Sequence, residues 1–167
     1  SDRAALAMLG VNFFGRPAES MTMIGVTGTN GKTTITYLIK HILESAGKKV
    51  GLIGTIQNLI GDISLPAKYT TPDAAELHVI FSRMANAGCE YVVMEVSSQA
   101  LMMYRVYGIE FEVGVFTNIS PDHIGDGEHK SFEEYLSFKG KLFTMCDKAV
   151  INADSDHIDY IGDIIRS

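Results

Sequence analysis

The stretch at residues 25–34, which reads GVTGTNGKTT, constrains the fold of this chain more than any other feature. It follows a short apolar run at 21–24 and precedes a helical pattern at 33–46, so it joins a strand to a helix. Gly28 and Gly31 allow a tight turn whose backbone can approach a polyphosphate closely. The amide groups and the dipole at the start of the helix favour an anion at the same place. The sequence therefore predicts a phosphate-binding loop after the first strand.

This loop is a variant of the usual pattern. The pattern G-x-x-x-x-G-K-[ST] requires glycine at position 26, where this chain has Val26. Lys32 can neutralise terminal phosphates, and Thr33 can offer its hydroxyl to Mg²⁺. The alternative is an ordinary glycine-rich turn with an N-capping threonine. The lysine and two threonines that follow the second glycine favour the phosphate-binding interpretation.

Composition and charge limit the classes of protein to consider. The chain has 167 residues, of which 46% are hydrophobic and 20% charged, as in a single globular domain. Its net charge of −6 argues against general affinity for nucleic acid, and no apolar run is long enough to cross a bilayer. Cys89 and Cys146 lack the spacing of metal ligands or of a CxxC motif. We therefore expect a cytoplasmic protein with reduced thiols and with no nucleic-acid or membrane partner.

Strand and helix patterns alternate along most of the chain. Apolar runs predict strands at 21–27, 49–54, 91–95, 112–117 and 149–152. Helical periodicity predicts helices at 2–14, 33–46, 72–87, 97–103, 131–145 and 156–167. This alternation predicts an α/β fold with a doubly wound, mostly parallel sheet. Residues 56–68 are less regular, and we expect them to form a loop or hairpin that stands off the sheet.

Polar side chains follow the predicted strands at their carboxyl ends, where such sheets bind ligands. Glu95 ends one strand and could reach a Mg²⁺ held by Thr33; the alternative is an exposed glutamate that caps the strand. His123 lies in a loop after the next strand, where a neutral imidazole could coordinate a metal; an isolated histidine is otherwise structural or exposed. The other four histidines lack this placement, and we expect surface or packing roles for them: His41, His78, His129 and His157. Thr71 is the expected N-cap of the helix that begins at Pro72.

Lys139 lies on the apolar side of the helix predicted at 131–145. Phe132 and Phe143 share this stripe with it at helical spacing. A lysine on an inward face is costly unless it is paired or chemically altered. Spacing alone favours a snorkelling lysine, whose stem packs while its head reaches water.

Taken together, these segments resemble the Mur ligase family, the ATP-dependent amino-acid-adding enzymes of bacterial peptidoglycan synthesis. The resemblance runs through nearly the whole chain in the family's order: residues 25–34, 69–72, 95–106, 117–123, 135–143 and 150–154. Within the family, residues 70–72 and 95–98 are most similar to the branch that adds the third residue of the peptide stem. Gln99 departs from the family's histidine, and the stretch 124–130 lacks its Leu-Asp-x-His sequence.

The resemblance implies a role for each candidate residue. The phosphates of ATP would be bound by Gly28, Thr29, Asn30, Gly31, Lys32, Thr33 and Thr34. One Mg²⁺ would be held by Thr33 and Glu95, and a second by Glu95, His123 and Lys139, with Lys139 carbamylated and thus anionic. The catalytic set would be Lys32, Glu95, His123 and Lys139. The UDP-N-acetylmuramoyl-dipeptide substrate would contact Thr70, Thr71, Ser97 and Arg105.

The implied reaction is the ATP-driven formation of an amide bond. The terminal carboxylate of the substrate attacks the γ-phosphorus of ATP, which gives ADP and an acyl phosphate. The amine of an amino acid then displaces phosphate. This sequence does not identify the amino acid, because the family makes that choice in its C-terminal domain.

The family has three domains, of which this chain resembles only the central ATPase domain. We therefore expect residues 1–20 to be a helix and linker that follow a missing preceding domain. Residues 21–167 would be the ATP-binding central domain, incomplete at its C-terminal end. The missing N- and C-terminal domains of the same enzyme would be its partners.

A nucleotide-binding loop of this kind has three alternative functions. The first is a related ligase, such as a folylpolyglutamate, cyanophycin or poly-γ-glutamate synthetase. The second is a GTPase-type switch, which would need an Asn-Lys-x-Asp motif that the sequence lacks. The third is a module that binds nucleotide without turning it over.

Overall fold

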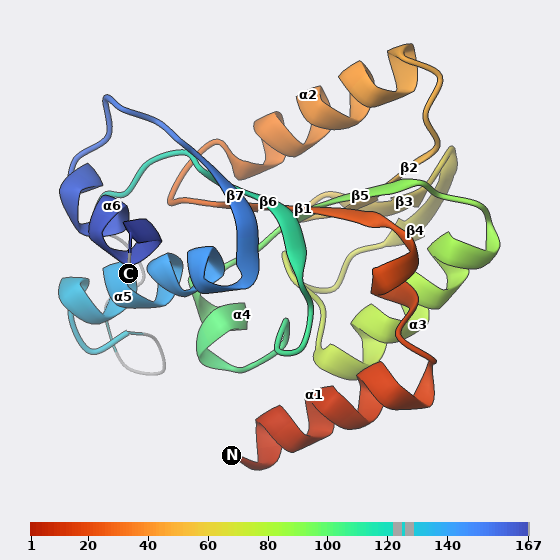
Figure 1. The fold of residues 1–167 in the computed structure, drawn as a ribbon, viewed down its shortest axis with the longest axis horizontal. Helices are drawn as coiled ribbons and strands as arrows, with labels where there is room; N and C mark the ends of the chain where they lie inside the picture. Colours follow the sequence, from red (N-terminus) through yellow and green to blue (C-terminus); the bar gives the residue numbers. More distant parts are fainter. Residues whose placement is uncertain (122–124, 126–128, 167) are drawn as a thin grey trace.

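The structure, a computed structural model, describes residues 1–121, 125 and 129–166 of the chain. These residues form a seven-stranded sheet with helices on both faces (Figure 1). The strands are β1 (Thr22–Thr27), β2 (Val50–Ile53), β3 (Gln57–Ile60), β4 (Ile63–Pro66), β5 (Tyr91–Glu95), β6 (Phe111–Phe116) and β7 (Cys146–Ile151). The α-helices are α1 (Asp2–Phe13), α2 (Lys32–Ser45), α3 (Ala74–Asn86), α4 (Ser98–Met102), α5 (Phe132–Gly140) and α6 (Ile158–Arg166). Two 3₁₀ helices, η1 (Pro17–Ser20) and η2 (Lys141–Met145), complete the set.

The strand order is β4-β3-β2-β5-β1-β6-β7. Strands β2, β5, β1, β6 and β7 run parallel to one another. The predicted doubly wound, mostly parallel sheet is therefore confirmed. Strand β1 lies between β5 and β6, with Ile24 opposite Val93 on one side and Val113 on the other. The loop at the end of β1 thus begins at the middle one of the five parallel strands, where loops from both neighbouring strands can reach it.

The hairpin at 56–68 corrects one expectation from the sequence. Strand β3 pairs antiparallel with β2, and β4 pairs with β3, so the hairpin extends the sheet instead of standing off it. Gly61, with φ +58°, and Asp62 form the tight connection between the two strands. Asn58 and Ile60 are buried, and this alternating burial favours docking on the sheet edge.

Successive residues of β1 supply the cores on the two faces of the sheet. Ile24 and Val26 belong to a cluster that packs under α2, against Ile35 and Ile39. Met23 points to the opposite face, where the larger cluster includes residues of α3. Figure 1 shows α2 alone above the sheet and α1, α3, α4 and α5 below it. The helix predicted at 131–145 is divided at Gly140, where α5 gives way to η2.

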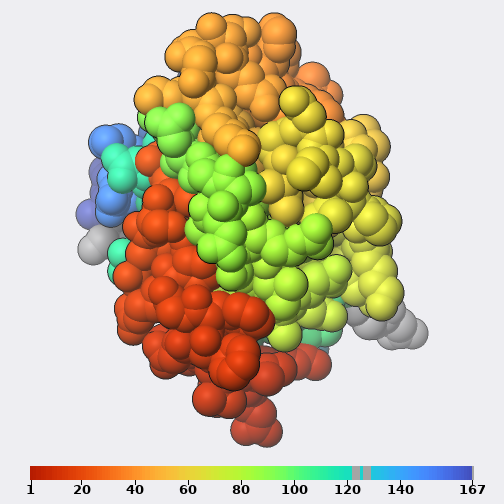
Figure 2. Space-filling view, turned by 90° about the vertical axis from the view of Figure 1, so that its right-hand side faces the viewer, coloured from red at the N-terminus to blue at the C-terminus, as the bar shows by residue number. Residues whose placement is uncertain are grey.

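Helix α1 and η1 cover the edge where the parallel strands begin. Figure 2 looks onto this edge, with residues of α1 and η1 (red) beside the end of α3 (green) and the hairpin (yellow). His78 of α3 is buried here, with its ring against that of Phe81. The ring also lies close to Gly10 of α1, where a built Cβ atom would be 2.7 Å from His78 Cδ2. Neither ring nitrogen of His78 has a hydrogen-bond partner among the described residues. Of the surface and packing roles expected for His78 from the sequence, its burial fits packing. In the described part of the chain, no helix has the length and apolar character to cross a membrane.

The buried His78 should make the stability of the chain depend on pH. Burial lowers the pKa of His78 below its ordinary value of 6.5. As pH falls through about 6.5, the unfolded chain binds a proton that the folded chain does not, so the free energy of unfolding decreases. We expect His78→Leu to show a smaller decrease than the wild type between about pH 7.5 and 5.5 in urea titrations. The exposed His41→Gln is the control and should retain the wild-type pH dependence; equal slopes for His78→Leu and the wild type would contradict the prediction.

Candidate functional site

The loop between β1 and α2 requires glycine at Gly28. Its φ is +149°, and a Cβ atom built there would lie 1.9 Å from the Thr117 Oγ1 atom after β6. Gly31 has φ +83° and is the N-cap of α2, with no atom within 4 Å of a built Cβ. The first amides of a helix have no intrahelical acceptors, so those after Gly31 suit a bound anion.

The segment after β6 braces this loop from the side. Asn118 accepts hydrogen bonds from the backbone amides of Thr29 (3.0 Å, to the main-chain oxygen) and Asn30 (2.9 Å, to Oδ1). The Thr117 hydroxyl and the Asn118 side-chain amide both donate to the Asn30 carbonyl, at 2.7 and 3.0 Å. The Thr29 hydroxyl is 3.0 Å from the Tyr135 hydroxyl of α5. Thr29 and Asn30 therefore hold the shape of the loop through their own polar groups.

Two lysines meet at one carbonyl oxygen of the loop. Lys32 Nζ donates to the Gly28 oxygen at 2.9 Å and to the Thr29 oxygen at 3.0 Å. Lys139 Nζ, from α5, donates to the same Gly28 oxygen at 2.7 Å and lies over the Tyr135 ring. Lys139 is only 2% exposed, so its head does not reach water and the snorkelling alternative is wrong. The heads of these two lysines therefore lie close together beside the loop.

Glu95 faces this loop from the end of β5. It is 1% exposed, and its Oε1 atom accepts a hydrogen bond of 2.9 Å from the Thr33 hydroxyl in the first turn of α2. Gly54, at the end of β2, leaves room for it, since a Cβ there would lie 2.4 Å from Oε1. Glu95 is thus not an exposed cap of its strand.

These groups form a donor set that suits a magnesium nucleotide. Mg²⁺ prefers oxygen ligands and often takes only one or two from protein, with phosphates and water completing its shell. Glu95 and Thr33 offer a carboxylate and a hydroxyl beside the phosphate-binding turn. The described residues contain no group of three or more His, Cys, Asp or Glu that could hold a metal alone. The geometry therefore fits a cation that is shared with phosphate groups.

A pocket of about 380 Å³ opens next to the loop and contains all four of the expected substrate-binding residues. It is lined by Lys32, Thr55, Lys68, Tyr69, Thr70, Thr71, Ser97, Ser98, Gln99, Met102, Arg105 and His129. Three cationic side chains and several hydroxyls suit an anionic ligand. A wider groove of about 720 Å³ lies at the opposite edge, where β1 and β5 begin. We assign the site to the smaller pocket, because ligands of such sheets bind at the carboxyl ends of the strands.

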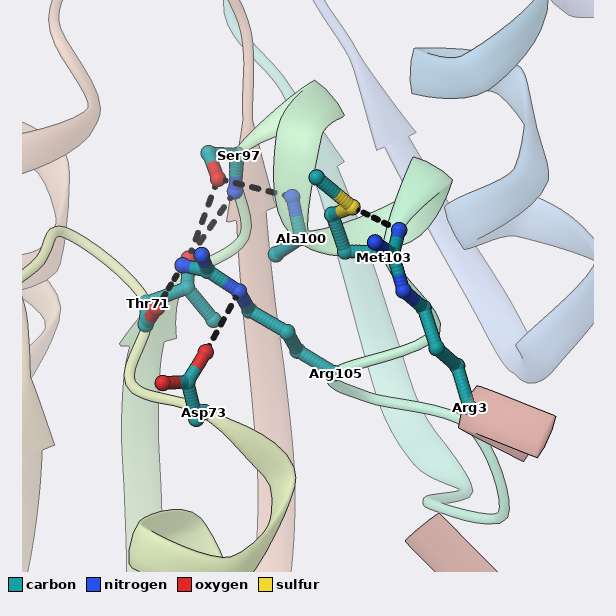
Figure 3. Close-up of polar contacts among 7 residues, drawn as sticks. All are labelled: Arg3, Thr71, Asp73, Ser97, Ala100, Met103 and Arg105. Carbon is teal, nitrogen blue, oxygen red and sulfur yellow. Dashed lines mark hydrogen bonds and ion pairs between the residues drawn. The ribbon is translucent and has the colours of Figure 1, made fainter. Parts of the chain in front are cut away.

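Arg105 fixes the turn on one wall of the pocket (Figure 3). Its Nη1 atom donates to the Thr71 carbonyl at 2.8 Å, its Nε atom lies 3.0 Å from Asp73 Oδ1, and its guanidinium lies over the Tyr69 ring. The expectation that Thr71 caps a helix starting at Pro72 is wrong, because Asp73 is the N-cap of α3. The Thr71 hydroxyl instead donates to the Glu95 carbonyl at 2.8 Å and accepts from the Ser97 amide at 3.1 Å. It ties the turn to the end of β5.

The structure brings most of the sequence-predicted residues to one edge of the sheet. Lys32 and Lys139 share the Gly28 oxygen, and Glu95 contacts Thr33 one residue after Lys32. Ser97 caps α4 by accepting a hydrogen bond from the Ala100 amide at 3.1 Å. His123 lies outside the described residues.

Sequence reasoning missed several residues of this site. Thr55 contacts Glu95, Asn118 and Tyr135 brace the loop, and the buried His129 lies 2.8 Å from the Ser98 hydroxyl. Thr55 directly follows the strand predicted at 49–54, and this position at the carboxyl end of a strand could have identified it as a candidate site residue. The sequence predicts only a surface or packing role for His129, and the fold shows that it lines the pocket.

Comparison with known proteins gives consistent matches. The family model described as "Mur ligase middle domain" matches residues 26–166. A protein of Caldanaerobacter subterraneus subsp. tengcongensis, named UDP-N-acetylmuramoyl-L-alanyl-D-glutamate--2,6-diaminopimelate ligase, is 51% identical over 93% of this chain and 32% of its own length. A protein of the same name from Alkaliphilus metalliredigens is 47% identical over 98% of this chain and 33% of its own length. The chain thus spans about a third of the length of these curated relatives.

Solved structures give the same picture. A structure of a UDP-N-acetylmuramoyl-L-alanyl-D-glutamate--2,6-diaminopimelate ligase superposes with a TM-score of 0.77 at 33% identity, covering 87% of this chain and 29% of the other. Mycobacterium tuberculosis folylpolyglutamate synthase complexed with ADP superposes with a TM-score of 0.76 over 99% of this chain and 44% of its own. At 17% identity, the second match shows a shared fold alone.

The requirement for glycine in the loop can be tested with Gly28→Ala. Alanine is strained at this positive φ, and its Cβ atom would overlap with Thr117, so the free energy of unfolding should fall by about 2 kcal/mol or more. Gly47→Ala is the matched control, since Gly47 has φ +78° but open space around a built Cβ, and should lose only about 1 kcal/mol. Urea unfolding measures both variants. An equal loss in the two would show that the contact with Thr117 does not constrain the loop.

Proposed function

The chain belongs to the Mur ligase family, whose middle domain it matches, and on this premise we propose that it is the ATP-binding part of a ligase that joins 2,6-diaminopimelate to UDP-N-acetylmuramoyl-L-alanyl-D-glutamate. The observation that carries the proposal is the meeting of Lys32, Lys139, Thr33 and Glu95 at one loop, beside a pocket with cationic walls. The acceptor and the amino acid are taken from the names of relatives about 50% identical to this chain. Tyr69 to Pro72 and Glu95 to Ser98 favour this branch over folylpolyglutamate synthetases.

The nucleotide would lie along the loop and the start of α2. We assign its phosphates to the residues named from the sequence: Gly28, Thr29, Asn30, Gly31, Lys32, Thr33 and Thr34. Asn118 already occupies the amides of Thr29 and Asn30, so direct amide contacts would come from Gly31 onward. The Lys32 ammonium lies at the loop and can move to the terminal phosphates by rotating about its side-chain bonds.

Glu95 and Thr33 would hold Mg²⁺, and Glu95, His123 and a carbamylated Lys139 would hold a second ion. When bound, Mg²⁺ supplies positive charge that stabilises the transferring phosphoryl group. The head of Lys139 is buried and lies at the loop oxygen of Gly28, which supports its place at this site, and the carbamate is taken from the family resemblance. His123 enters this proposal from the family resemblance alone.

The acceptor would occupy the pocket of about 380 Å³. Arg105, Thr70, Thr71 and Ser97 would hold it, and the cationic walls suit its carboxylates. Lys32 lines both this pocket and the loop, so it can stabilise charge as the acceptor carboxylate attacks the γ-phosphorus. The amine of diaminopimelate would then displace phosphate from the acyl phosphate and form the amide.

The purified 167-residue chain should bind Mg·ATP without forming an amide, because it spans only a third of the relatives' length. Lys32→Ala should weaken binding in calorimetry by about tenfold or more, through the loss of a charge-assisted contact. The exposed Lys141→Ala is the control and should bind as the wild type does. Amide product from the chain alone, or equal binding by Lys32→Ala and Lys141→Ala, would contradict the proposal.

A further inference from the structure

Thr55 holds both oxygens of the Glu95 carboxylate. Its backbone amide donates to Glu95 Oε1 at 2.9 Å, and its hydroxyl donates to Oε2 at 3.0 Å. The Thr33 hydroxyl donates to Oε1 as well, at 2.9 Å. Thr55 itself is exposed at the wall of the pocket, directly after β2 and Gly54.

Two contacts from one residue fix the plane of this carboxylate. The last torsion of a glutamate side chain is broad, and the other two hydrogen bonds among the described residues both end on Oε1, so the Thr55 hydroxyl is the contact that restrains Oε2. The amide contact belongs to the backbone and is present whatever side chain stands at position 55. The hydroxyl contact to Oε2 therefore sets the direction in which the remaining lone pair of this oxygen points.

The Thr55 hydroxyl also connects Glu95 to the acceptor pocket. It lies 3.0 Å from the Thr70 hydroxyl as well as from Glu95 Oε2. A hydroxyl has one proton to donate and can also accept, and a bond to a carboxylate is the stronger one. Thr55 thus donates to Glu95 and accepts from Thr70. These hydrogen bonds form a chain that leads from the pocket to the carboxylate.

We propose that Thr55 is a positioning residue, which orients Glu95 toward the divalent cation of the bound nucleotide and ties this carboxylate to the pocket at Thr70. The inference rests on the proposed function, since it needs a metal nucleotide at Glu95. It adds to that function a residue that does not itself touch the metal. Hydrogen-bond partners of metal ligands commonly change metal affinity by about 10- to 100-fold when they are removed.

The test compares Thr55→Val with Thr55→Ser in the purified chain. Valine keeps the shape and the backbone amide but lacks the hydroxyl, whereas serine retains it. ADP affinity is measured by calorimetry with Mn²⁺ and again in EDTA, and bound Mn²⁺ is measured by electron paramagnetic resonance. We expect Thr55→Val to bind Mn·ADP about tenfold or more weakly than the wild type, with unchanged affinity for ADP in EDTA. Thr55→Ser and the exposed control Thr144→Val should match the wild type throughout.

Each other outcome has a definite meaning. Equal Mn·ADP affinity in Thr55→Val and the wild type overturns the inference, as does an equal loss with and without metal, which would indicate a general structural role. A loss in Thr55→Ser as large as in Thr55→Val overturns it too. If Thr55→Val does not give the wild-type circular dichroism spectrum, Thr55→Ala replaces it under the same criteria. A wild type whose ADP affinity does not rise with Mn²⁺ overturns the proposed function itself.

Discussion

The carbonyl oxygen of Gly28 is the point on which this site depends. It accepts hydrogen bonds from Lys32 and from Lys139, which come from helices far apart in the sequence. Only a glycine permits the backbone at this position to turn as it does against Thr117. The loop is therefore held from three directions: from α2, from α5 and from the segment after β6. A polyanion approaching it meets a preformed cradle, so little ordering is needed on binding.

The topology of the sheet explains why residues from distant segments converge there. Strand β1 is central, so the ends of β5 and β6 flank its loop on the two sides. Glu95 comes from one neighbour, and Thr117 and Asn118 follow the other. Strand β2 lies on the other side of β5, and Thr55, two residues after its end, reaches Glu95 with its hydroxyl. A parallel sheet with this order places all these loops at the carboxyl ends of its strands. The larger groove lies where the strands begin, away from these loops.

The sequence predicted the sheet and the loop well, because both depend on local patterns. Apolar runs identified five strands, and β5 was bounded correctly at Tyr91 and Glu95. Prediction from the sequence failed where tertiary contacts outweigh local conformational preference. Thr71 has the pattern of a helix cap, yet its hydroxyl bonds across to β5, so the cap falls to Asp73. The hairpin after β2 has weak strand propensity and is stabilised by pairing with the sheet edge, which no local pattern reveals. The helical stripe placed Lys139 on the apolar side of its helix, but spacing alone favoured a head that reaches water. Its full burial and its contact with Gly28 both depend on how α5 packs.

The proposed function requires that a divalent cation and a nucleotide bind together at the carboxyl ends of β1 and β5. Paramagnetic broadening of backbone amide signals by Mn·ADP in the isotope-labelled chain tests this most directly, because broadening falls steeply with distance from the ion. We expect the amides of Gly31 to Thr34 and of Glu95 to lose their signals first, while those of Met21 and Glu90 at the opposite ends of the strands keep theirs. Broadening centred on Met21 and Glu90, or spread evenly over the sheet, would contradict the proposed function.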